Sequence, residues 1–155
     1  MKWSKTLVSA AVLIATLGAA NTANAERLGM MRYLANHARV EQAGAGNGSA
    51  IAQNGGANGA FVSQNGFGNG ARITQNGVNN QGLIRQVGRN NSGSLTQEGD
   101  NNAACLFQAG RNHDASIAQV NGGNVGVVQN MLGTYVVSAE ECAAMVARNR
   151  RILGR

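Results

Sequence analysis

From about residue 38 to residue 130, the chain repeats one pattern of apolar and polar positions with a period of eleven residues. Each copy carries a glutamine, with an aliphatic residue two positions before it. A fixed period over this length is typical of proteins built from stacked structural repeats. The glutamines are Gln42, Gln53, Gln64, Gln75, Gln86, Gln97, Gln108 and Gln119, and the aliphatic residues are Val40, Ile51, Val62, Ile73, Ile84, Leu95, Leu106 and Ile117.

Three further positions complete the unit A-x-I-x-Q-x-G-x-x-N-x. A small residue stands four positions before each glutamine, and glycine follows two positions after it in every copy except at Asn121. Asparagine follows at the fifth position except at His113: Asn47, Asn58, Asn69, Asn80, Asn91, Asn102 and Asn124. A ninth, imperfect copy with Val127 and Gln129 comes after ten residues instead of eleven.

The spacing within each unit predicts a short strand followed by a turn. Small, aliphatic and glutamine positions alternate by two, which places them on one face of a strand. Glycine and asparagine suit the positive φ of tight turns, and their frequency excludes the helical supercoil that eleven-residue repeats otherwise form. We therefore predict an all-β solenoid of the cross-β type, with two strands and about 22 residues per rung.

Stacking such rungs places each glutamine and asparagine above its equivalent, so that the amides bond along columns. Buried amides without partners cost about 1–3 kcal/mol, and the first and last rungs would expose open strand edges. We expect these edges to recruit further copies. A monomeric solenoid with capped ends is the alternative.

The segments that flank the repeat predict an exported protein. Residues 1–25 read as a signal peptide with Lys2 and Lys5, an apolar run and a small-residue cleavage site before Glu26. Residues 26–37 form an N-terminal segment of undecided role. Residues 131–155 form a C-terminal segment, in which the sequence predicts a short helix capped by Ser138 and Glu141 and followed by a basic tail. That tail, Arg148, Arg150, Arg151 and Arg155, would either bind anionic polymers or simply be solvated.

The chain has two cysteines, Cys105 and Cys142. Cys105 lies three residues before Gln108, so its side chain is expected on the outer face of its strand. In an exported protein, an even pair of cysteines favours a disulfide, which would fix the C-terminal helix to the solenoid. Free thiols or an intermolecular bond are the alternatives.

Composition and motifs argue against catalysis. The chain has 22 Gly, no Pro, 13% charged residues and a formal net charge of +6. His37 and His113 lack companion ligands, and Asp100 and Asp114 lie in turns of different units, so we predict no metal, cofactor or catalytic site. We expect that the protein is not an enzyme.

The repeat resembles the curlin repeat of bacterial curli subunits, most closely at Gln97-Glu98-Gly99-Asp100-Asn101-Asn102-Ala103. This resemblance implies export through a dedicated outer-membrane pore with its export factors, and assembly with itself and related subunits into extracellular functional amyloid. It also implies roles in adhesion and biofilm. Curli contain a major subunit and a minor, nucleating subunit. The A-x-I-x-Q form of the strands, together with the arginine-rich end, is more similar to the minor type, although the small residues four positions before glutamine also suit a major subunit.

The outward residue just before each glutamine varies along the repeat. A regular binding face, such as that of an ice-binding solenoid, would need these positions to repeat, so their variety favours assembly over recognition. We therefore predict a structural subunit of a cell-surface fibre, with a nucleating subunit or a monomeric surface-binding solenoid as alternatives. The outward residues are Glu41, Ala52, Ser63, Thr74, Arg85, Thr96, Phe107 and Ala118.

Overall fold

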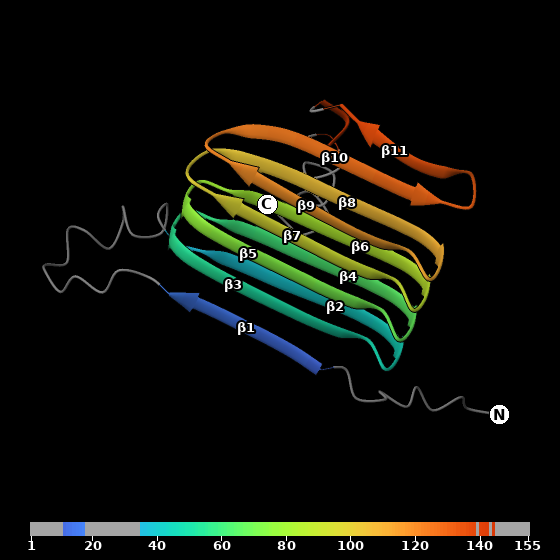
Figure 1. Ribbon diagram of the computed structural model, residues 1–155. Helices are drawn as coiled ribbons and strands as arrows, with labels where there is room; N and C mark the ends of the chain where they lie inside the picture. The colour runs from blue at the N-terminus through green and yellow to red at the C-terminus, as the bar shows by residue number, and fades with distance from the viewer. Residues whose placement is uncertain (1–10, 18–34, 139, 143, 145–155) are drawn as a thin grey trace, which may run out of the picture.

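The computed structural model describes residues 11–17, 35–138, 140–142 and 144, and most of these residues form a β-solenoid (Figure 1). The chain alternates between two sheets, each running through the full stack. One contains β1 (Ala11–Leu17), β3 (Gly48–Gly56), β5 (Gly70–Val78), β7 (Ser92–Glu98) and β9 (Asp114–Val120). The other contains β2 (His37–Ala45), β4 (Gly59–Phe67), β6 (Gln81–Arg89), β8 (Asn102–Arg111), β10 (Gly123–Asn130) and β11 (Gly133–Val137).

From β2 to β9, strands two apart in the sequence pair in parallel, with equivalent residues facing each other at a spacing of 22. Gln53 pairs with Gln75 and Gln64 with Gln86, and the aliphatic residues follow the same register. Because two eleven-residue units complete one turn of the chain, every unit meets the unit two places away. The predicted fold class, a β-solenoid with two strands in each rung of 22 residues, is confirmed.

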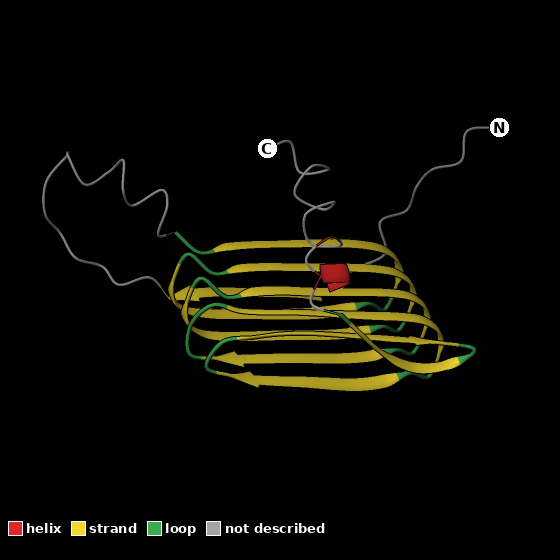
Figure 2. Cartoon of the chain, turned by 90° about the horizontal axis from the view of Figure 1, so that it is seen from above, coloured by secondary structure: helices red, strands yellow, loops and turns green. Residues whose placement is uncertain are grey.

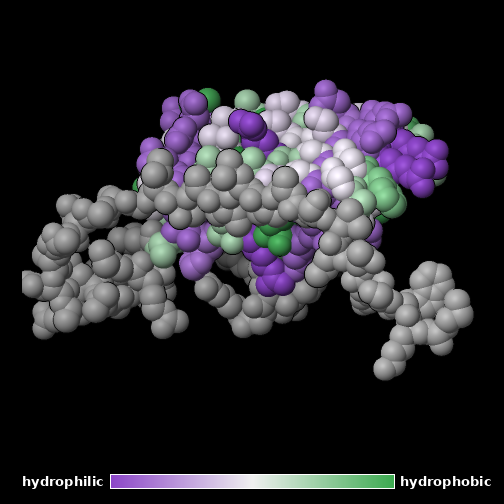
Figure 3. Space-filling model, turned by 90° about the horizontal axis from the view of Figure 1, so that it is seen from below, coloured by the Kyte–Doolittle hydropathy of each residue, from purple (hydrophilic) through white to green (hydrophobic). Residues whose placement is uncertain are grey.

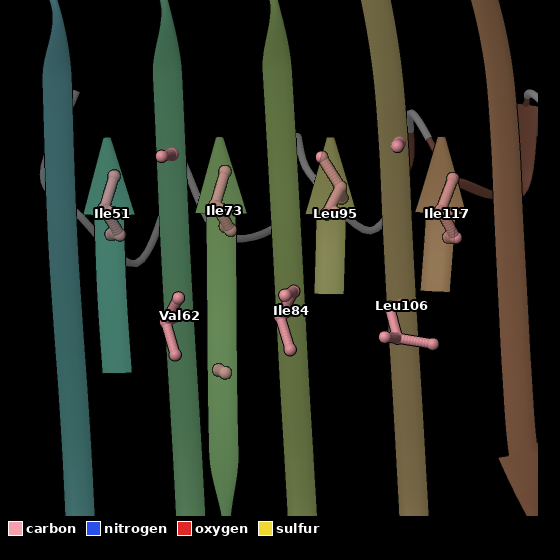
Figure 4. Close-up of a cluster of buried hydrophobic side chains, with 10 residues drawn as sticks. Ile51, Val62, Ile73, Ile84, Leu95, Leu106 and Ile117 are labelled. Carbon is pink, nitrogen blue, oxygen red and sulfur yellow. The ribbon is translucent and has the colours of Figure 1, made fainter. Parts of the chain in front are cut away.

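The core is a narrow apolar layer between the two sheets. Ile51, Ile73, Leu95 and Ile117 point inward from one sheet, and Val62, Ile84 and Leu106 from the other (Figure 4). All seven are buried, whereas Val40 in the first rung is half-buried. Each strand from β3 to β9 contributes one of these seven side chains to the layer, so the apolar core has the same period as the sequence.

The turns depend on residues in the left-handed region of φ. The fourth residue after each glutamine adopts a φ between 55° and 67° through the first seven units: Gly46, Ala57, Gly68, Asn79, Asn90, Asn101 and Asn112. Glycine and asparagine tolerate this conformation, which accounts for their recurrence there. Ala57 is the one residue of these seven that is neither glycine nor asparagine, although it adopts the same conformation.

At the C-terminal end the regular stacking stops. β11 runs antiparallel to β10 and pairs Val136 with Val127. Residues 140–142 and 144 are helical, and Ser138 and Glu141 cap the helix: the Glu141 amide donates to Ser138 Oγ, and the Ser138 amide donates to Glu141 Oε2. Figure 2 shows this short helix together with the strands, and Cys142 within it packs with Leu83 and Cys105.

The apolar run expected within the signal peptide supplies β1, which pairs in parallel with β3 and places Thr16 opposite Gln53. Cleavage before Glu26 stays a prediction. Within the described part of the chain, no helix is long and apolar enough to cross a bilayer.

Candidate functional site: the amide ladders and their ends

The glutamines form two continuous hydrogen-bonded columns, one in each sheet. Each Nε2 donates to the Oε1 of the glutamine in the next rung, at distances between 2.5 and 2.9 Å. One column contains Gln42, Gln64, Gln86 and Gln108 and ends at Gln129; the other contains Gln53, Gln75, Gln97 and Gln119. The columns are therefore polar: acceptors face the N-terminal rung, and donors face the C-terminal rung.

A second bond from each Nε2 crosses from one sheet to the other. Gln86 donates to the carbonyl oxygen of Gly70 at 2.8 Å, and Gln64 donates to that of Gly48 at 3.0 Å. From Gln53 to Gln119, the accepting carbonyl stands sixteen positions earlier, at the beginning of a strand in the opposite sheet. Gln42 Nε2 instead bonds Ser49 Oγ, and Gln129 Nε2 bonds the Asp114 carbonyl oxygen, fifteen positions earlier. Each glutamine thus connects neighbouring rungs and also ties the two sheets together. From Gln64 to Gln119, both the oxygen and the nitrogen of the buried amide have partners.

The asparagines at the turns form a parallel set of columns. Asn80 Nδ2 donates to the Gly99 carbonyl oxygen at 2.8 Å, and Asn80 Oδ1 accepts from the backbone amide of Asn102 at 3.0 Å. The buried members of these columns are Asn47, Asn58, Asn69, Asn80, Asn91 and Asn102. His113 continues one column through its backbone amide alone, which donates to Asn91 Oδ1 at 3.2 Å.

The placement of Asn124 in this ladder is wrong. Asn124 lies opposite Ala103 instead of Asn102, and it is exposed. The reason is the ten-residue interval between Gln119 and Gln129. This interval keeps Gln129 opposite Gln108 but moves the preceding asparagine by one position, which turns its side chain to the other face of the strand.

Three buried polar atoms have no hydrogen-bond partner among the described residues: Gln42 Oε1, Gln53 Oε1 and Asn102 Oδ1. The first two are the open acceptors at the N-terminal edge of the glutamine columns. The third lies on β8, where the one-residue shift of β10 removes the expected partner. Buried amide oxygens of this kind are costly when they stay unpaired, so they mark candidate positions for contact with another chain.

Cys105 and Cys142 form a disulfide, with their Cα atoms 5.7 Å apart. Cys105 points away from the main core, as the odd offset predicts, into a second apolar cluster with buried Leu83 and half-buried Phe61. The disulfide ties the segment after β11 to the outer face of β8. This cluster was not predicted from the sequence, although Phe61, Leu83 and Cys105 each stand three positions before a glutamine in alternate units.

The outer surface is chemically mixed. Hydrophilic and hydrophobic residues are interspersed on the described part of the face in Figure 3. The guanidinium of Arg85 lies 6.0 Å from the Phe107 ring centre, and that of Arg89 lies 5.6 Å from Phe67. Such contacts contribute about 0.5–1 kcal/mol at exposed sites. The face offers no repeated chemistry comparable to that of the inner ladders.

The acidic residues and histidines that were considered as possible metal or catalytic residues lie apart from one another. Asp100 Oδ1 accepts from the backbone amide of Val78, and a ring nitrogen of His113 lies 3.2 Å from the Ala109 carbonyl oxygen. Across the described ranges, no three His, Cys, Asp or Glu side chains come together in a group that could hold a metal ion. The arginines of the tail and most of residues 26–37 lie outside the described residues.

Comparison with known protein families gives a match over part of the chain. Neither the curated proteins nor the solved structures include a significant match to the chain. Residues 88–120, which contain Gln97, Gln108 and Gln119, match the family described as the curlin associated repeat. This match covers β7 to β9 with the preceding turn, and the earlier units share the same ladder positions. The predicted resemblance is confirmed at residues 88–120, which carry the curlin associated repeat.

Proposed function

We propose that this protein is an exported structural subunit of an extracellular, curli-like amyloid fibre. Its polymerisation would extend the amide ladders from one copy to the next, and the fibre would serve adhesion and the biofilm matrix. The curlin repeat and the solenoid fold both favour a structural role over catalysis.

The observation that carries the proposal is the polarity of the unpaired groups at the ends of the glutamine columns. Gln42 Oε1 and Gln53 Oε1 are buried acceptors without partners in the part of the chain that is described. At the other end, Gln119 Nε2 has Ala103 O as its single described partner, so one N–H remains for a further acceptor. A column that ends in acceptors on one side and donors on the other can be continued head to tail.

The proposal is tested by thioflavin-T fluorescence and fibre diffraction on the chain that starts at Glu26. We expect self-polymerisation with a meridional reflection near 4.8 Å, the spacing of stacked strands. A β-rich monomer that neither polymerises nor seeds a related subunit would reject the proposal. It would favour the monomeric surface-binding solenoid, the candidate that β11 supports by covering the edge of β10.

The same assay separates the major from the minor subunit. Strong acceleration of a related curlin-repeat subunit by a low proportion of this chain would identify the nucleating type. The export pore, its accessory factors and the binding of anionic polymers by Arg148, Arg150, Arg151 and Arg155 belong to this proposal as well. Vesicles with and without anionic lipid would test the tail, since binding through arginines should weaken as salt is added.

A further inference from the structure

The strands of the solenoid do not form a whole number of rungs. β2 to β9 make four complete two-strand rungs, and β10 adds half of a fifth rung in one sheet, with β11 on its outer side. β9 is the last strand of the other sheet (Figure 1). The C-terminal edge is therefore stepped, while β2 and β3 form a complete rung at the N-terminal edge.

We propose that the β10–β11 hairpin is a displaceable plug, and that it occupies the position where the β2 strand of a second copy docks. With the hairpin displaced, β8 and β9 form a complete two-strand rung with the same repeat register as β2 and β3. This inference rests on the proposed function, because it specifies how copies of the chain join.

All three unpaired buried oxygens support this docking. The contacts within the chain show how one rung meets the next: Gln42 Oε1 would accept from Gln108 Nε2 of the preceding copy, and Gln53 Oε1 from Gln119 Nε2. The third oxygen is Asn102 Oδ1. It would accept from the backbone amide of Asn36, just as Asn80 Oδ1 accepts from Asn102.

The hairpin satisfies this edge less completely than a full rung would. β10 leaves Asn102 Oδ1 unpaired and Asn124 exposed because of the ten-residue interval. Gln129 Nε2, which would donate to the next rung, instead bonds Thr134 Oγ1 of β11 at 3.3 Å. Exchange of the hairpin for β2 of another copy therefore replaces an imperfect contact with a regular one.

The opposite edge shows that this solenoid accepts an added parallel strand. β1 pairs with β3 from Ala11 to Leu17 and occupies the position that β9 of a preceding copy would take. The pairings of β2 to β11 with one another do not involve β1. The chain from Glu26 therefore keeps the described ladder while presenting β3 as a free edge.

The disulfide controls how far the plug can move. It ties Cys142 to Cys105 on β8, so the displaced hairpin stays beside the edge it covered and can return. A tether of this kind raises the effective concentration of the plug at its site. We expect the oxidised chain to elongate more slowly than the reduced one.

A matched pair of variants tests the plug. Val127 and Val136 are paired residues of the hairpin, but Val127 packs against the core whereas Val136 is 79% exposed. Val127→Asp buries a charge in the closed state and should speed elongation of the chain from Glu26 at least about tenfold, because the open state gains population. Val136→Asp adds the same charge at an exposed position and should leave the rate close to that of the wild type.

A cross-link tests the register. In the proposed joint, residue 39 of one copy lies opposite Cys105 of the preceding one, as Arg39 lies opposite Phe61 within the chain. Fibres of Arg39→Cys/Cys142→Ser should contain an intermolecular disulfide to Cys105 when digested and examined by mass spectrometry. Glu41→Cys/Cys142→Ser is the control, because its cysteine is displaced by two residues and should link several-fold less.

The outcomes separate the two proposals. If no variant forms fibres, the proposed function fails and the plug fails with it. Fibres in which Val127→Asp and Val136→Asp elongate at the same rate, or in which positions 39 and 41 link equally to Cys105, would overturn the plug and leave the fibre subunit standing. Faster elongation of Val127→Asp, together with a disulfide that forms selectively between position 39 and Cys105, would establish the plug.

Discussion

The carbonyl oxygen of Gly88 stands where a side chain on Gly66 would begin. A Cβ built on Gly66 would lie 1.8 Å from that oxygen, and Gly66 has a φ of 130°. The same approach recurs between Gly44 and Gly66 and between Gly55 and Gly77. In the first five units, the glycine two positions after the glutamine is therefore required by the close approach of rungs as well as by its backbone conformation.

Gly66→Ala should be severely destabilising, by about 3 kcal/mol or more, because the rungs must separate or the backbone must change conformation. Gly70→Ala is the matched control. A Cβ there meets nothing within 4 Å, and φ is not positive. Urea denaturation of both variants measures the difference. Equal stabilities would show that the rungs at this turn are not packed as described.

Gln86→Leu should destabilise the protein by several kcal/mol. The change leaves Gln64 Nε2, Gln108 Oε1 and the Gly70 carbonyl without their present partners, and each buried unpaired group costs about 1–3 kcal/mol. Arg85→Leu, at the exposed neighbouring position, should change stability by less than about 1 kcal/mol. Thermal denaturation followed by circular dichroism compares them, and a neutral Gln86→Leu would refute the buried ladder.

Asn91→Ala and Asn124→Ala separate a ladder asparagine from an exposed one. Asn91 Nδ2 donates to the Gly110 carbonyl at 3.2 Å, and Asn91 Oδ1 accepts from the amide of His113. Removal of these bonds should cost about 2–3 kcal/mol, whereas Asn124→Ala should stay within about 0.5 kcal/mol of the wild type. Similar losses at both positions would contradict the one-residue shift of β10.

Ala57→Gly and Ala57→Asn should stabilise the protein. Ala57 has a φ of 57°, and the equivalent turn residues are glycine or asparagine. A left-handed conformation costs an ordinary residue about 1–2 kcal/mol, so a rise in stability of about 1 kcal/mol is expected. An increase in the denaturation midpoint measures the effect. Ala52→Gly, in the neighbouring strand where φ is not positive, should lower stability instead.

The solenoid could be predicted from the sequence because its determinants are local and recur. An inward glutamine such as Gln86 and an inward aliphatic residue such as Ile84 stand two positions apart, and parity along a strand fixes which residues share a face. The outward direction of Cys105 follows from the same parity. A fixed period of eleven then implies columns of identical amides, whatever the details of the turns.

The tertiary structure decided what lies at the ends. The ten-residue interval before Gln129 moves Asn124 out of its column, and the pairing of β10 with β8 leaves a half rung sealed by β11. It also joined Cys105 to Cys142 and buried Leu83 outside the main core. The local pattern fixes which face of the strand a side chain lies on. Which residue it meets in the next rung depends on the number of residues in every preceding unit, and on how segments distant in sequence pack against the solenoid. The sequence by itself determined the ladder, and the tertiary structure determined how it begins and ends.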